Sequence, residues 1–158
     1  MRKNTGCFTG HRPEKLFMSE ESMKAAMQYE ISAAISDSIT TFITGMARGV
    51  DLWAAQLVLE AKRDNPHIKL VCAVPYTGFE KKWSKEWQQL YNEVIAASDF
   101  TKTFYPAFNY HSFQMRNRWM VDHSIRIIAV YHGGRGGTYN TLEYAKTQNI
   151  RICMIRGW

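Results

Sequence analysis

The sequence lacks a long apolar run. None of its hydrophobic stretches approaches the ~18 residues that a membrane-spanning helix needs, and Met1 to Thr5 do not lead into the apolar core of a signal peptide. Proline is scarce, with four residues, and no low-complexity tract or repeat is present, which argues against a disordered or linker-rich chain. We therefore expect a cytoplasmic protein with no membrane partner.

Cysteine is also rare. Cys7, Cys72 and Cys153 each lie within an apolar run, and no two of them form a C-x-x-C pair. A free thiol in such a run behaves as a small hydrophobic side chain. We expect all three cysteines to be buried and reduced, and we predict neither a metal site nor a cofactor.

Acidic residues are outnumbered by basic ones. The chain has 20 Lys and Arg against 14 Asp and Glu, a formal net charge of +6. This excess permits an anionic partner such as a nucleotide phosphate or a nucleic acid. A length of 158 residues, 46% of them hydrophobic, suits one globular domain spanning residues 1–158.

Short β-rich runs alternate with longer amphipathic stretches along the whole chain. Apolar residues at i, i+3 and i+4 predict helices, and another helix is expected to carry Arg116 to Arg118. Alternating strands and helices are typical of a three-layer α/β fold with a mostly parallel sheet of about six strands. The expected strands are 5–9, 40–44, 69–74, 100–105, 125–131 and 150–155, and the expected helices are 23–35, 50–61, 83–97 and a weaker one near 142–145.

Glycines gather where the predicted strands end. In a parallel sheet all strand-to-helix loops emerge at the carboxyl edge, and eight of the ten glycines fall in or beside these loops. The helix-to-strand loops are short and chemically plain. This asymmetry predicts a ligand site at the carboxyl edge of the sheet.

The loop after the fifth strand is the richest in glycine. Gly133, Gly134, Gly136 and Gly137 precede a helix expected to begin near Thr138, a context in which backbone N–H groups can hold a phosphate. The alternative is a plain flexible turn. The spacing matches neither the Walker loop nor G-x-G-x-x-G, which disfavours ATP hydrolysis and an ordinary NAD site.

A similar arrangement follows the second strand. Gly45 and Gly49 bracket Arg48, for which a phosphate or ribose contact is favoured over a plain surface charge. Asp51 falls in the first turn of the next helix, where a capping contact and a ligand contact are equally favoured.

Other candidate side chains lie in the first loop and before the fifth strand. After Gly10, Pro13 restricts Arg12 to extended backbone and so aims its side chain, whereas a structural role is favoured for His11. Arg116 and Asn117 project about 100° apart on a helix, so at least one must lie near the core. A solvated position suits Arg118 and Arg126 better than Arg116.

Aromatic residues divide into two groups. Trp53, Trp83 and Trp87 have helical spacing among apolar residues and are predicted to be core residues rather than base-stacking platforms. The other group lies in carboxyl-edge loops, and one of its members is expected to stack on a nucleobase. This group comprises Tyr76, Phe79, Phe108 and Tyr110.

Four segments together resemble the YpsA family of the SLOG superfamily, which also contains Smf/DprA proteins and the LOG phosphoribohydrolases. They are TGHRPEKL at 9–16, ITGMARGVDLWAA at 43–55, RNRWMVDHS at 116–124 and GGTYNT at 136–141. The resemblance implies a Rossmann-like sheet that binds nucleotides, nucleotide-derived signals or nucleic acid. Because related folds often pair through helices, it also allows a homodimer.

The resemblance also implies site residues. Gly45, Arg48, Gly49 and Asp51 match the GxARGxD stretch of DprA-like proteins, and Arg116-Asn117-Arg118 matches their RNR stretch, both implied to face the ligand pocket. LOG enzymes carry a P-G-G-x-G-T-x-x-E loop whose glutamate supports cleavage of the N-glycosidic bond. Aligning Gly137-Thr138 with its Gly-Thr places Thr141 at the glutamate position, and no proline precedes the glycines.

These observations favour binding of a nucleotide or nucleotide-derived ligand, a phosphorylated ribosyl compound such as an ADP-ribose-like molecule. One alternative is a nucleoside 5′-monophosphate phosphoribohydrolase with Arg116 and Glu143 as weak catalytic candidates, although a surface ion pair with Lys146 is favoured for Glu143. The other alternative is single-stranded nucleic-acid binding, which we regard as secondary.

Overall fold

The first strand of the chain lies inside the sheet and is bordered by partners from opposite halves of the sequence. The computed structural model describes residues 2–156. In this part, β1 (Thr5–Gly10) pairs in parallel with β2 (Thr41–Thr44) and with β5 (Arg126–Tyr131). The full strand order is β4-β3-β2-β1-β5-β6, all parallel, with β3 Lys69–Tyr76, β4 Phe100–Tyr105 and β6 Arg151–Arg156.

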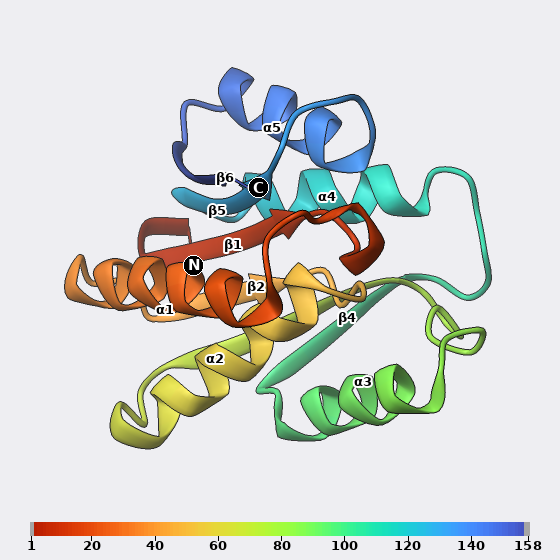
Figure 1. Ribbon diagram of the computed structural model, residues 1–158, viewed down its shortest axis with the longest axis horizontal. Coiled ribbons are helices and arrows are strands. Elements are labelled where there is room, and N and C mark those ends of the chain that lie inside the picture. The colour runs from red at the N-terminus through yellow and green to blue at the C-terminus, as the bar shows by residue number, and fades with distance from the viewer. Residues whose placement is uncertain (1, 157–158) are drawn as a thin grey trace.

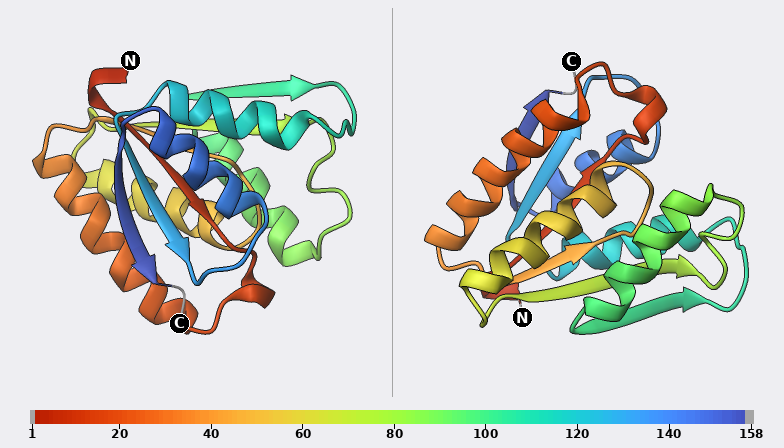
Figure 2. Two further views of the ribbon diagram at one scale, coloured as in Figure 1. Left: turned by 90° about the horizontal axis from the view of Figure 1, so that it is seen from above. Right: turned by 60° about the horizontal axis from the view of Figure 1, so that its bottom comes forward.

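Helices cover both faces of this sheet (Figure 1). On one face lie α1 (Glu20–Ser36), α2 (Val50–Asp64) and α3 (Lys85–Ala97), which pack side by side. On the other lie α4 (Ser112–Asp122) and α5 (Gly137–Thr147). Figure 2 shows the twist of the sheet, because its edge strands β4 and β6 point in visibly different directions. The predicted three-layer α/β, Rossmann-like fold is confirmed.

Alternate residues of the strands supply two separate cores. Phe8 and Phe42 face α1–α3, and their rings lie 5.9 Å apart. Cys7 and Ile43, the neighbouring residues, face α4 and α5. Successive side chains of a strand point to opposite faces, and a sheet covered on both sides must therefore be apolar throughout, as these runs are.

Most element predictions hold to within two residues, and the three cysteines are buried and free. Trp53 is a core residue as predicted, while Trp83 and Trp87 are partly buried and pack against the same core. None of the helices within residues 2–156 combines the length and apolar character that crossing a bilayer requires.

The prediction of a solvated position for Arg126 is wrong. Arg126 begins β5, which lies inside the sheet between β1 and β6, and its side chain is only 7% exposed. Its Nη2 donates a 2.6 Å hydrogen bond to Oδ2 of Asp37, the residue that ends α1. No local pattern indicates this partner, which lies 89 residues away along the chain.

The position of β1 creates a change of direction in the sheet. The chain winds outward from β1 to β4, and then returns to add β5 and β6 on the other side of β1. The loops after β1 and β5 therefore diverge on opposite faces, which leaves a crevice at the carboxyl edge. Such a crevice is the usual ligand position in open α/β sheets.

Gly10 allows α2 to approach the end of β1 at this crevice. A Cβ atom built on Gly10 would lie 2.6 Å from Cβ of Val50, the first residue of α2. Such a distance forces the strand and helix apart. The glycine is therefore needed for packing, independently of any ligand.

We expect Gly10→Ala to lower the free energy of unfolding by about 1–3 kcal/mol, the usual cost of overpacking a filled core. Urea denaturation measures the change. Gly137→Ala is the matched control, because a Cβ there meets nothing within 4 Å and the position begins a helix. Equal stability of Gly10→Ala and wild type would contradict the packing role.

Candidate functional site

A cavity of about 540 Å³ occupies the carboxyl edge beside β1. Its walls come from the loops after β1, β2 and β5, from α4, and from the segment between β3 and α3. The sequence-predicted site residues that line it are Gly10, His11, Arg12, Arg48, Asp51, Arg116, Asn117, Gly136, Gly137 and Thr138. Segments far apart in the sequence thus meet around one space, whose size is typical of small-molecule sites.

The remaining predicted residues lie next to this cavity or behind its walls. Gly45 and Gly49 shape the loop after β2, Gly133 and Gly134 belong to the loop after β5, and Thr141 lies one turn into α5. None of these five is among the lining residues described for the cavity. Their ligand-binding role stays a prediction, as does that of the ten residues that line it.

Gly45 lies so close to Arg116 and Asp51 that no side chain fits at this position. Its carbonyl accepts a hydrogen bond from Nη1 of Arg116. A Cβ on Gly45 would lie 2.7 Å from that same Nη1 and 2.8 Å from Oδ2 of Asp51. Any side chain would therefore displace either the buried guanidinium or the carboxylate.

Gly49 joins the loops after β1 and β2. It is the residue before α2 and has φ of +87°, a conformation that favours glycine. A Cβ would also lie 2.9 Å from Cδ of Pro13. The two glycines of this loop are thus explained by backbone shape and close packing.

Arg116 and Asp51 form the buried charged floor of the site. Arg116 is 5% exposed, as expected if one member of the Arg116-Asn117 pair lies near the core. Its Nε donates to Oδ1 of Asn117 at 2.7 Å, and Nη1 also reaches the carbonyl of Ala73 at 3.5 Å. The guanidinium therefore links α4 to the ends of β2 and β3.

Asp51 is 7% exposed, and only one of its carboxylate oxygens is used inside the protein. Oδ2 accepts a 3.2 Å hydrogen bond from the backbone N–H of Ala47 in the loop before α2, and no side chain caps the N-terminus of this helix. Oδ1 is buried and accepts no hydrogen bond from the described residues. Burial raises the pKa of Asp51 to about 6, although Arg116 and the Ala47 N–H act in the opposite direction.

Basic side chains surround the mouth of the cavity. Arg12 has the extended backbone predicted from Pro13, with φ −65° and ψ 158°, and its side chain is exposed. Arg48 donates a 2.7 Å hydrogen bond from Nη2 to Oε1 of Glu14, so an anionic ligand would compete with Glu14 for it. Lys15 and Arg135 add two further cations.

The loop after β5 exposes its backbone. Gly133, Gly134 and Gly136 have φ of +98°, +87° and +146°, and a Cβ on any of them would meet nothing within 4 Å. Glycine is therefore favoured at these positions because of their positive φ angles and not because of close neighbours. No side chain caps α5, so its first N–H groups are left for solvent or a ligand.

His11 is held as a neutral ring beside this loop. Its ring lies 4.2 Å from that of His132 and 5.4 Å from that of Tyr131, measured between centroids. Burial, His132 and Lys15 together lower the pKa of His11 to about 4. A neutral imidazole at pH 7 offers a hydrogen bond to a ligand but no charge.

Glu143 lies outside this cavity. It lines a separate cleft between α4 and α5 and forms the surface ion pair that the sequence favours, with Nζ of Lys146 at 3.0 Å. Thr141, which lines the same cleft, donates through Oγ1 to the carbonyl of Gly137 at 2.9 Å. Among the described residues that line the carboxyl-edge cavity, Asp51 is the one acid.

Sequence reasoning missed several lining residues. Lys15 lies inside the segment 9–16 and Arg135 lies between the glycines of the loop after β5, so both positions were usable signals. Phe113 and Trp83 reach the cavity only through the packing of α4 and of the segment before α3, which no local pattern reveals. Of the loop aromatics, Phe79 lines the cavity, while Tyr110 lines the neighbouring cleft.

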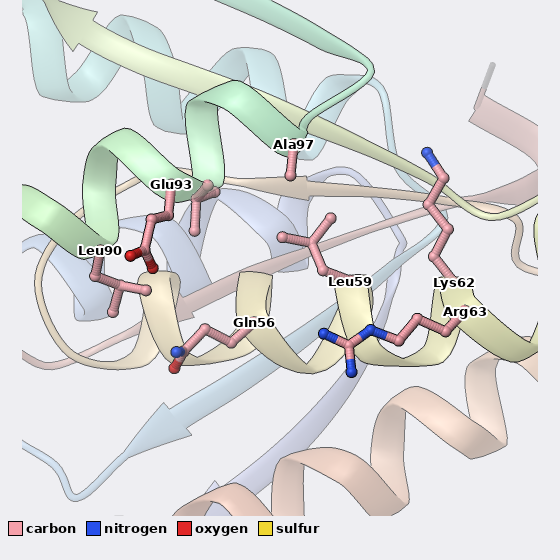
Figure 3. Close-up of a pocket in the computed structure, with 8 residues that line it drawn as sticks. Gln56, Leu59, Lys62, Arg63, Leu90, Glu93 and Ala97 are labelled. Carbon is pink, nitrogen blue, oxygen red and sulfur yellow. The ribbon is translucent and has the colours of Figure 1, made fainter.

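A further groove lies between α2 and α3, and none of the sequence-predicted site residues lines it. Its volume is about 420 Å³, and Leu59, Arg63 and Leu90 are among the side chains that line it (Figure 3). It lies away from the loops that end the strands. The sequence-predicted residues therefore point to the carboxyl-edge cavity and not to this groove.

Comparison with known sequences identifies the family. The model of the YspA SLOG family matches residues 6–155, so the chain belongs to this family. The prophage-derived protein YoqJ of Bacillus subtilis is 36% identical over 138 residues, which cover 74% of this chain and 78% of YoqJ. A UPF0398 protein of Bacillus licheniformis is 28% identical, covering 90% of this chain and 84% of its own.

Two solved structures share the fold. DNA processing protein A (DprA) from Streptococcus pneumoniae superposes with a TM-score of 0.68 at 17% identity, over 98% of this chain and 51% of its own. DprA from Helicobacter pylori, described for its single-stranded DNA binding mode, gives a TM-score of 0.65 at 17% identity. The superposition covers 95% of this chain and 64% of that DprA. The chain thus spans between half and two thirds of these proteins.

The raised pKa of Asp51 predicts a pH-dependent stability. Between about pH 4 and pH 6 the folded protein holds a proton on Asp51 that the unfolded chain releases, so the free energy of unfolding falls as pH rises, by up to about 3 kcal/mol. Asp51→Asn removes this dependence. We expect the stability of the variant relative to wild type to increase from pH 4 to pH 7 in urea denaturation.

Asp64→Asn is the matched control, because Asp64 is an exposed aspartate at the other end of α2. Its stability relative to wild type should stay constant over the same range. Parallel pH profiles for wild type and Asp51→Asn would show that burial does not perturb this carboxyl.

Proposed function

We propose that this member of the YspA SLOG family binds a nucleotide or nucleotide-derived compound, a phosphorylated ribosyl ligand, in the carboxyl-edge cavity. The observation that carries the proposal is the convergence of basic side chains and an exposed glycine loop on one cavity. Arg12, Arg48, Arg116 and Arg135 reach it from four different segments. Phosphate oxygens are the groups that such a combination of guanidinium and backbone N–H donors recognises.

The parts of the cavity suit different parts of such a ligand. The exposed residues Gly136 and Gly137 lead into α5, and the start of this helix suits a phosphate. The unpartnered Oδ1 of Asp51 suits a hydrogen-bond donor such as a sugar hydroxyl, because a carboxylate oxygen only accepts. Phe79 and Trp83 add aromatic surface at the wall opposite, suited to a base.

A thermal-shift screen of nucleotides and ADP-ribose tests the proposal. A compound present at ~100 times its Kd stabilises the folded protein by about 2.7 kcal/mol. We expect Arg12→Gln and Arg135→Gln each to weaken binding about ten-fold, the cost of losing a hydrogen bond to a charged group. Arg63→Gln, an exposed arginine in the α2–α3 groove, should leave binding unchanged.

The absence of any shift across the screen at millimolar concentration would rule out this function. Equal losses in all three arginine variants would instead indicate a nonspecific charge effect. The test therefore separates a site from the general positive charge of the chain.

Single-stranded nucleic acid is a second candidate ligand. It is favoured by the fold shared with DprA and by exposed aromatic side chains beside the cavity, with Phe108 57% and Tyr110 90% exposed. Bases stack on such rings with little sequence preference. The net charge of +6 is compatible with this ligand.

Oligonucleotides of increasing length distinguish the two candidates. Nucleic-acid binding predicts that affinity for oligothymidylates rises with length and falls with salt, with a log–log slope of about −0.7 for each phosphate contacted. Fluorescence polarisation at several salt concentrations measures both. An affinity independent of length would exclude the nucleic-acid candidate.

A further inference from the structure

The carboxyl-edge cavity has a neighbouring cleft on the face of the sheet that α4 and α5 cover. A cleft of about 620 Å³ lies between α4 and α5, which pack against each other. Phe113, Asn117 and Gly137 line both spaces. A ligand in the cavity would therefore contact the wall of the cleft, and a longer ligand could occupy both.

The cleft presents planar surfaces at positions fixed by the fold. The Tyr144 hydroxyl donates to Oδ1 of Asp122 at 2.6 Å, which anchors the ring between α5 and the end of α4. The guanidinium carbon of Arg118 lies 5.0 Å from the centre of that ring. Tyr110, 90% exposed, is at the open side before α4. Rings and guanidinium planes are the surfaces on which nucleobases stack.

Charge in the cleft is limited. Among the described residues that line it, Arg118 is the one cation, and the charge of Glu143 is paired with Lys146. Amide and hydroxyl groups, such as those of Asn140 and Thr147, supply the remaining polar surface. A path for successive phosphates needs a row of cations, so the cleft suits one uncharged nucleoside rather than a strand.

Gly137 marks the junction of the two spaces. It is the first residue of α5 and lines both spaces, so the first N–H groups of this helix, which no side chain caps, lie beside the region that the spaces share. Phosphates at the junction would meet these donors, with one nucleoside on either side. The order nucleoside, phosphates, nucleoside therefore matches the order cavity, junction, cleft.

We propose that the α4–α5 cleft is a second subsite, which takes the second nucleoside of a ligand made of two nucleosides joined through a diphosphate. The proposal rests on the proposed function, because the first nucleotide occupies the carboxyl-edge cavity. Each space lies within the ~300–1,000 Å³ of small-molecule sites. A mononucleotide fills only one of them.

Calorimetric titrations with AMP and with di(adenosine-5′) diphosphate test the second subsite. We expect the dinucleotide to bind at least ten-fold more tightly than AMP. Arg118→Gln and Tyr110→Ser, which change residues outside the carboxyl-edge cavity, should weaken dinucleotide binding about five-fold or more and leave AMP binding within two-fold. Arg63→Gln and Tyr29→Ser, exposed residues on α2 and α1, are the matched controls and should change neither.

Each adverse result has a separate meaning. Equal affinities for AMP and the dinucleotide would overturn the second subsite and leave the proposed function standing. Failure of both compounds to bind would overturn the second subsite, and it would overturn the proposed function as well if the nucleotide screen also gave no shift. An affinity that continues to rise for oligothymidylates longer than two nucleotides would assign the cleft to nucleic acid and overturn this proposal.

Discussion

The guanidinium of Arg116 lies where α4, the loop after β2 and the end of β3 meet, and the shape of the site follows from it. It donates to the carbonyl groups of Gly45 and Ala73, and its charge faces Asp51. A buried guanidinium is costly unless its N–H groups are satisfied, so these partners must hold their positions. Gly45 has no side chain because either charged neighbour would be displaced. Arg116 thereby holds α4, on one face of the sheet, against the loop that leads to α2 on the other face.

The fold could be predicted from the sequence because it depends on local periodicity. Strand-length apolar runs predicted the six strands, and helical spacing between them predicted the α/β class of the fold. The ends of most elements fall within two residues of those expected. The glycine loops identified the carboxyl edge for the same reason, since the end of a strand is a local feature. Residues as distant as Gly10 and Thr138 line one cavity because parallel strands end together.

Pairings between distant side chains could not be predicted. Arg126 was expected in solvent, but strand order places it in the interior beside Asp37. Arg48 was identified as a candidate, yet its ion pair with Glu14 depends on how closely Gly49 lets the loops after β1 and β2 approach. Phe113 and Trp83 likewise reach the cavity through helix packing. Spacing along the chain does not encode these distances.

The acid at the candidate site lies on α2 and not on the helix that follows the glycine loop. The resemblance to LOG enzymes places Thr141 where their loop has a glutamate, and the Thr141 hydroxyl donates a hydrogen bond to the carbonyl of Gly137 within α5. Glu143 lies in the neighbouring cleft and pairs with Lys146. Asp51, on α2, is instead the carboxyl group at the cavity. The carboxyl group that a ligand in the cavity would meet therefore comes from the face of the sheet opposite to α5.

The pairing of β1 with β5 also constrains how the chain can fold as it is synthesised. Residues 5–7 pair with residues 41–43, which are made early, but the other edge of β1 has no strand to pair with until residues 126–130 emerge. Contacts of such long sequence separation slow folding, because the intervening loop must be closed before the contact stabilises anything. Until then, the unpaired N–H and C=O groups along this edge of β1 are available to chaperones or to another nascent chain.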